Sequence, residues 1–362
     1  MIAFAILLAG VITATPIPKT PIPNVSSLPK SQYPAIPHAA KDACMLNGNF
    51  VIMSEDGVYL AILKSNNWET HELLRRAEGT AETFWSVDCH PMFEDGHPQI
   101  IVTRVRDGIW RSAILAEDDG KWHVRMDNLP FALRWVNWQN KGQWLADPLF
   151  QQDSGGRVYA MGDGSRYLFE VEGDDKKLKL GKRYKFPIGT TLDNWNQLPN
   201  GNIAVLRQQR LEIWSGQKRY KKRQSLPGCG TTTVCAMSQT WAMSGIGYDY
   251  CRTQAPIIWN NLAVAVHNNL LIDDVFGRTP MVEHSDLEYL AVDPLTDALH
   301  FYQRQGPFIG EITAYFIDKN PVSGAMTLFV LLQDKSLGQA LSEGVKETML
   351  LSMPLDSLVP ED

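Results

Sequence analysis

Asp-Gly turns between short apolar runs constrain this chain more than any other feature. The stretch from Gln99 to Leu115 contains an apolar run, the turn Asp107-Gly108 and a second run that carries an aromatic residue. Asp-Gly between two such runs is the strongest short-range signal for a β-hairpin, because the turn needs positive φ angles that glycine adopts without steric cost. The sequence therefore predicts antiparallel hairpins.

A three-strand unit built on this hairpin occurs twice, over residues 49–73 and 99–125. Each copy has an apolar strand, an Asp-Gly turn, an aromatic-bearing strand, a polar turn and a strand that carries Trp. Looser copies follow, with strands expected at 156–161, 167–171, 179–186, 202–206, 211–214, 262–266, 270–272, 287–292, 298–302, 311–317, 325–332 and 347–353. Asn268-Asn269 stands between two of these strands.

Repeats of about forty to fifty residues made of short antiparallel strands are typical of a β-propeller. One small sheet cannot bury its own faces, so several must pack together. We predict an all-β fold, a β-propeller of about six or seven blades, over residues 43–358, with a short helix possible at 337–346. A pair of two-layer β-sandwiches explains the strand content but not the repeat.

One stretch resembles a degenerate FG-GAP/VCBS-type propeller repeat. It starts at Val87-Asp88, has the acidic turn Glu94-Asp95-Gly96 and ends in an apolar strand at Val102. In that family the acidic turn binds calcium, because hard cations prefer carboxylate and carbonyl oxygens. Gln99 stands where the family carries its last Asp, so we predict no cofactor and keep calcium as the alternative.

Two stretches near the C-terminus, 291–299 and 314–326, are similar to the strand-Asp-turn-strand hairpins of lactonase-like propellers. The resemblance implies the fold and says little about activity.

The N-terminus predicts export. Residues 1–14 form an apolar segment that ends in small residues and is short for a membrane span, which is typical of a signal peptide. The Pro-rich residues 15–42 predict a tether or strap, because proline favours extended backbone. We expect a periplasmic or secreted protein with no membrane span in the mature chain.

The five cysteines agree with an oxidising compartment. Cys229 and Cys235 are near neighbours across a Gly/Thr loop and predict a local disulfide. Cys44 and Cys89 are a possible second pair, which leaves Cys251 odd. The alternative is five free thiols in a cytosolic protein.

The net charge of -6 is mild and spread along the chain, so nucleic acid is not an expected partner. The one basic run, 218–223, is interpreted as a solvated strand edge or loop.

Aromatic residues are densest at Trp135, Trp138 and Trp144. With Arg134 beside them, stacked indoles would make a platform for a sugar or a peptide. The alternative is that they seal the contacts between blades, and Trp195 has the same two interpretations.

Two groups of His, Asp and Glu residues are candidates for a catalytic or metal site, and the sequence alone identifies no catalytic residue in either. His90, His97, Glu94 and Asp95 share one loop and are interpreted as solvated turn residues rather than metal ligands. A second region, comprising His267, Asp273, Asp274, His284, Asp286 and Glu288, would matter only if it converged on a central channel.

These observations predict a binding or scaffolding module that engages a protein or a glycan. The alternative is a propeller hydrolase, a lactonase or a glycan-active enzyme, with a metal or paired carboxylates in the channel. A structural subunit of an envelope assembly is a third possibility.

Overall fold

The computed structural model describes residues 34, 40–65, 67–80, 82–93, 96–106, 109–127, 129, 146–153, 156–163, 167–174, 177–185, 194–197, 202–207, 210–215, 221–227, 257–259, 262–271, 281–292, 299–334 and 347–355. The described strands form six antiparallel sheets, named A to F in chain order, and within each sheet every strand pairs with the next one along the chain.

Sheet A contains β1 (Asp42–Leu46), β2 (Asn49–Met53), β3 (Gly57–Lys64) and β4 (Asn67–Arg75). Sheet B contains β5 (Glu82–Asp88), β6 (Gln99–Arg106), β7 (Ile109–Asp118) and β8 (Lys121–Met126). Sheet C contains β9 (Ala146–Gln152), β10 (Val158–Asp163), β11 (Tyr167–Asp174) and β12 (Lys177–Lys185). Sheet D contains β13 (Asn194–Gln197), β14 (Ile203–Arg207), β15 (Arg210–Ser215) and β16 (Lys221–Pro227). Sheet E contains β17 (Ile257–Trp259), β18 (Leu262–Leu271), β19 (Met281–Val292) and β20 (Leu299–Ile309). Sheet F contains β21 (Glu311–Lys319), β22 (Met326–Asp334) and β23 (Glu347–Pro354).

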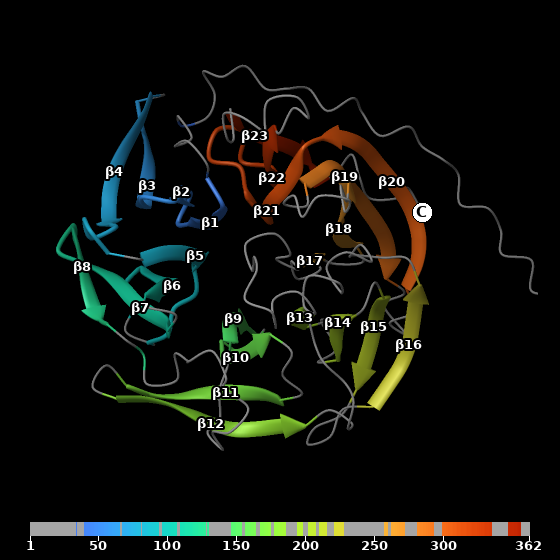
Figure 1. The fold of residues 1–362 in the computed structure, drawn as a ribbon, viewed down its shortest axis with the longest axis horizontal. Coiled ribbons are helices and arrows are strands. Elements are labelled where there is room, and N and C mark those ends of the chain that lie inside the picture. Colours follow the sequence, from blue (N-terminus) through green and yellow to red (C-terminus); the bar gives the residue numbers. More distant parts are fainter. Residues whose placement is uncertain are drawn as a thin grey trace, which may run out of the picture.

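The sheets stand around one centre, with the first strand of each sheet innermost (Figure 1). This arrangement is a β-propeller and confirms the predicted fold class. The β-sandwich alternative is wrong, because the sheets surround a common axis instead of stacking in two pairs of layers.

The burial pattern explains why the second and third strands of each sheet, such as β2, were the easiest to predict from the sequence. Successive side chains of a strand point to opposite faces. Phe50 and Ile52 of β2 pack toward sheet F, whereas Val51 and Met53 pack toward sheet B. Since both faces are covered, the strand is an unbroken apolar run, while the outer strand β4 is largely exposed.

Neighbouring sheets pack through buried hydrophobic clusters. Such clusters join sheets A and B, B and C, E and F, and F and A. Burial of apolar surface contributes about 25 cal/mol per Å², so these clusters are the main source of stability between the sheets.

The ring closes by direct contact between the first and last sheets. Gln333 Nε2 donates a hydrogen bond to Ala40 O over 2.7 Å. Phe50 of sheet A meets Phe329 of sheet F edge to face, with ring centroids 5.2 Å apart, and Phe316 stacks on Phe329 at 5.3 Å. Aromatic pairs in these geometries contribute beyond their buried area.

The sequence prediction differs from the structure most clearly in sheet E. The separate strands expected at 262–266 and 270–272 are one strand, because β18 continues from Leu262 to Leu271. Its pairing with β19 shifts register between Asn269 and Leu270. The polar pair is thus accommodated as an irregularity within the strand instead of ending it.

The leader 1–14 and the helix proposed for 337–346 lie outside the described residues. Of the Pro-rich segment 15–42, the structure describes Pro34 and residues 40–42, and Ala40 and Asp42 are buried. None of the described elements is a helix long and apolar enough to cross a membrane.

Candidate functional site

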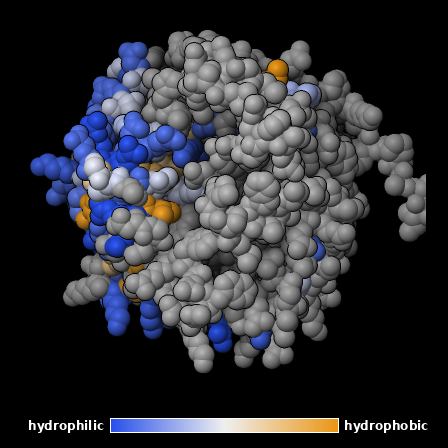
Figure 2. Space-filling model, viewed as in Figure 1, coloured by the Kyte–Doolittle hydropathy of each residue, from blue (hydrophilic) through white to orange (hydrophobic). Residues whose placement is uncertain are grey.

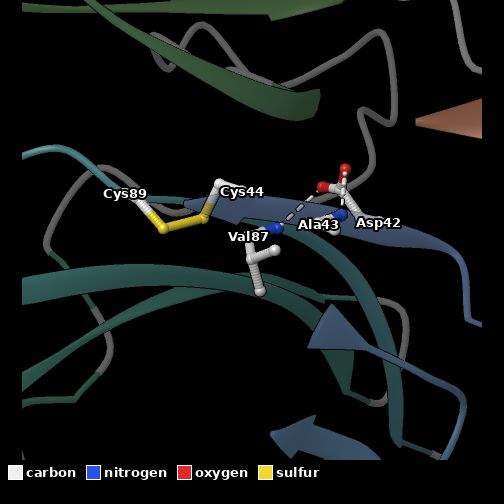
Figure 3. Close-up of a disulfide and its surroundings, with 5 residues drawn as sticks. All are labelled: Asp42, Ala43, Cys44, Val87 and Cys89. Carbon is white, nitrogen blue, oxygen red and sulfur yellow. Dashed lines mark hydrogen bonds between the residues drawn. A yellow bond between two sulfur atoms is a disulfide. The ribbon is translucent and has the colours of Figure 1, made fainter. Parts of the chain in front are cut away.

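A disulfide joins the inner strands of the first two sheets. Cys44 on β1 bonds to Cys89, which directly follows β5, and the Cα atoms are 5.8 Å apart (Figure 3). The carboxylate of Asp42 accepts hydrogen bonds from the backbone N–H of Val87 at 2.9 Å and of Ala43 at 3.0 Å. The pair left possible by the sequence is therefore confirmed, whereas Cys229, Cys235 and Cys251 lie outside the described residues.

A pocket lies where the chain passes from sheet A to sheet B. Its volume is about 320 Å³, and it is lined by Asp56, Arg75, Arg76, Glu78, Gly79 and Thr80. Asp56 belongs to the turn between β2 and β3, and the others belong to the end of β4 and the connection that follows it. Two segments about twenty residues apart in sequence therefore form one site.

Hydrogen bonds fix the walls of this pocket. The backbone N–H of Arg76 donates to Asp56 O over 2.7 Å, which holds the two segments together. Within the connection, Thr80 Oγ1 donates to Ala77 O over 2.6 Å, and Ala77 N–H donates to Glu82 Oε2 over 3.5 Å. The site is therefore shaped before any ligand arrives.

The lining combines both charge signs. Arg75 contacts Glu72 at 3.9 Å, and both side chains are largely exposed, so this ion pair is weak. The side chain of Arg76 makes no ion pair within the described part of the chain.

Figure 2 shows that the described surface in view over sheets A and B is mainly hydrophilic, with isolated hydrophobic residues.

A buried ion pair supports the next connection around the ring. Arg104 at the end of β6 contacts Glu82 at 3.1 Å, and their side chains are 9% and 1% exposed. Arg104 also pairs with Asp127, which follows β8. Breaking such a pair leaves a buried charge uncompensated and costs about 3–5 kcal/mol.

The predicted aromatic platform belongs to the connection between β8 and β9, but its four residues lie outside the described part of the chain: Arg134, Trp135, Trp138 and Trp144. The structure describes the beginning of this connection. Leu129 N–H donates to Ser112 O over 2.8 Å, and the Leu129 side chain is buried between sheets B and C. The platform stays a prediction.

The predicted solvated loop is described in part. The half-exposed ring of His97 contacts Asp118 at 3.2 Å, and Asp118 also contacts His123 at 3.2 Å. Burial lowers the pKa of His90 to about 4. Among the residues that the structure describes, no three His, Cys, Asp or Glu side chains form a group able to hold a metal ion, and Glu94 and Asp95 lie outside them.

The acidic region of sheet E lies away from the innermost strand. His267 of β18 is paired in register with Asp286 of β19, and the innermost strand of that sheet is β17. These positions therefore do not line the ring centre, while Asp273 and Asp274 are outside the described residues.

The pocket residues were not predicted from the sequence. Arg75-Arg76 and Glu78-Gly79-Thr80 have the composition of an ordinary polar connection. Only the pairing of β2, β3 and β4 places Asp56 against them. The one available signal was the pair of adjacent arginines directly after a predicted strand.

The fold and site define this chain as a β-propeller with a polar pocket at the junction of its first two sheets. No family model and no curated protein matches it.

Three solved structures are similar in fold. A putative 6-phosphogluconolactonase from Bacteroides fragilis is 10% identical, with 87% of each chain covered and a TM-score of 0.49. An aldose sugar dehydrogenase from Streptomyces coelicolor, in its PQQ-bound form, is 8% identical, with 89% of this chain and 96% of that chain covered and a TM-score of 0.45. Virginiamycin B lyase from Staphylococcus aureus is 8% identical, with 82% and 92% covered and a TM-score of 0.39. At these values the likenesses carry no argument about activity.

Proposed function

We propose that this chain is an exported β-propeller that acts as a binding or scaffolding module for a protein or a glycan. The observation that carries the proposal is the polar pocket at the connection from sheet A to sheet B. Its walls are held by one hydrogen bond between the β2–β3 turn and the connection after β4, and by another within that connection. Binding there requires little ordering of the protein, which leaves more of the interaction free energy for affinity.

Export is supported by two separate features. Residues 1–14 have the composition of a signal peptide. The disulfide between Cys44 and Cys89 is of the kind that persists in oxidising compartments. We therefore propose a periplasmic or secreted location.

The hydrolase alternative requires carboxylates that are free to act on a ligand. Asp42 on an innermost strand accepts two backbone hydrogen bonds, and Glu82 pairs with a buried arginine. Both carboxylates are therefore engaged in contacts within the protein. Cleavage of a ligand is nevertheless one of the outcomes that the following experiment can detect.

The test is a binding screen with three forms of the purified protein. Wild type, the pocket variant Arg76→Ala/Glu78→Ala and the surface control Arg183→Gln are applied to a glycan array and to a library of peptides. We expect wild type and control to bind the same ligands and the pocket variant to lose at least tenfold in affinity. Equal binding by all three forms would remove the pocket from the proposal, and release of cleaved ligand would favour the hydrolase.

A further inference from the structure

We propose that the pocket formed by the β2–β3 turn and the connection after β4 binds a sugar that carries a carboxylate, such as the uronic acid end of a glycan. The inference rests on the proposed binding function and names the chemistry of the ligand. It follows from what each lining residue can offer.

The two arginines supply the donors for an anion. A guanidinium binds a carboxylate through two parallel N–H···O bonds, a geometry that a lysine does not match. Arg76 has no ion pair in the described structure, and Arg75 has only the long contact with Glu72. An anionic group would give both side chains a better partner than they have at present.

The remaining polar side chains suit hydroxyl groups. Asp56 and Glu78 are acceptors when ionised. Thr80 already donates its hydroxyl proton to Ala77 O, so its oxygen can only accept from a ligand. Hydroxyl groups can donate to all three, and a sugar ring presents several of them.

The lining also argues against two other ligands. None of the six lining residues has an apolar side chain, whereas peptide sites commonly anchor an apolar or aromatic residue. A phosphate carries more negative charge than a carboxylate, and Asp56 and Glu78 would repel it more strongly. The mixture of two cations and two anions therefore favours a singly charged, hydroxylated ligand.

The size of the pocket limits the ligand to a small unit. Its volume of about 320 Å³ is at the lower end of the range for small-molecule sites, about 300–1,000 Å³. One side is open at Gly79, because nothing lies within 4 Å of the position that a Cβ would occupy there. A longer chain attached to the bound sugar could leave the pocket there.

The experiment compares two disaccharides that differ in one group. Cellobiouronic acid ends in a glucuronic acid, and cellobiose has a CH₂OH in its place. Binding of each is measured by titration calorimetry and by ligand-observed NMR. We expect cellobiouronic acid to bind at least tenfold more tightly than cellobiose, and its binding to weaken as salt is raised, because the contact is an ion pair near the surface.

Variants connect this binding to the pocket. Arg76→Gln should weaken the binding of cellobiouronic acid at least tenfold. Arg183→Gln, which changes an exposed arginine of sheet C, should leave this binding unchanged.

Three results would overturn the inference: equal affinity for the two disaccharides, tighter binding of glucose 6-phosphate, or an equal loss of affinity in both variants. If the screen finds another ligand that Arg76→Gln abolishes while cellobiouronic acid does not bind, the binding function stands and the ligand class is wrong. If no ligand of any kind binds, both fail.

Discussion

At the scale of single residues, burial decides which side chains respond to pH. His90 directly follows the disulfide-bonded Cys89, and burial lowers the pKa of its imidazole to about 4. In an unfolded chain the pKa is about 6.5. Folding therefore favours the neutral ring, and the stability that depends on this is present above pH 6.5 and is lost as the pH falls from about 6.5 toward 4.

The variant His90→Gln tests this link. Between pH 7.5 and pH 4.5 the free energy of unfolding should fall for both proteins, but less for the variant. The difference between the two falls should be about 1–2 kcal/mol, a figure reduced because the His90 side chain is partly exposed. Urea unfolding at several pH values measures the difference, and His71→Gln, at an exposed position, is the matched control. An NMR titration that places the His90 ring near pH 6.5 would contradict the assignment.

At the scale of elements, the disulfide fixes the inner strands of two neighbouring sheets. Cys44 and Cys89 are 45 residues apart, so the bond closes a loop that contains most of sheet A. A crosslink of this kind stabilises mainly by restricting the unfolded chain.

The variant Cys44→Ser/Cys89→Ser should lower the free energy of unfolding by about 2–4 kcal/mol. A reducing agent should lower the stability of wild type in urea unfolding by at least as much, since it would also reduce the disulfide predicted between Cys229 and Cys235, and mass spectrometry of proteolytic fragments should find the linked Cys44 and Cys89 peptides only in untreated wild type. Unchanged stability after verified reduction would show that the hydrogen bonds of Asp42 and the apolar contacts suffice between these sheets.

Strands were predictable from the sequence where local pattern and tertiary environment agree. The hairpin of β6 and β7 combines apolar runs with an Asp-Gly turn, and it was predicted almost to the residue. The stretches 291–299 and 314–326 likewise fall on paired hairpins. Two innermost strands were missed for different reasons: β17 has only three residues, and β5 mixes polar and apolar residues without a continuous apolar run.

The candidate site could not be predicted in the same way. Spacing along the chain does not show that Asp56 meets the residues after β4, since this depends on the pairing of three strands. The pairing of Cys44 with Cys89 was one possibility among several, and only the juxtaposition of β1 and β5 selects it.

At the scale of the whole molecule, the contact between sheets F and A closes the ring, and we expect the ring to unfold as a single cooperative unit. Phe329 is fully buried and packs against Phe50 across this contact. The variant Phe329→Ala should lower the free energy of unfolding by about 3–5 kcal/mol, from lost transfer energy and the cavity left behind.

Urea unfolding of this variant should remain one transition when followed by tryptophan fluorescence and by circular dichroism. Val322→Ala, at an exposed position of the turn between β21 and β22, is the control and should change little. Two separated transitions in wild type would mean that the sheets unfold independently.

The bond from Gln333 to Ala40 spans 293 positions of the chain, and this has a consequence during biosynthesis. A ribosome adds roughly 5–20 residues per second, so the first blade waits roughly 15–60 s for the last one to emerge. During that time the apolar face around Phe50 lacks the sheet that covers it in the folded ring, and exposed apolar surface of this kind makes a nascent chain prone to aggregation.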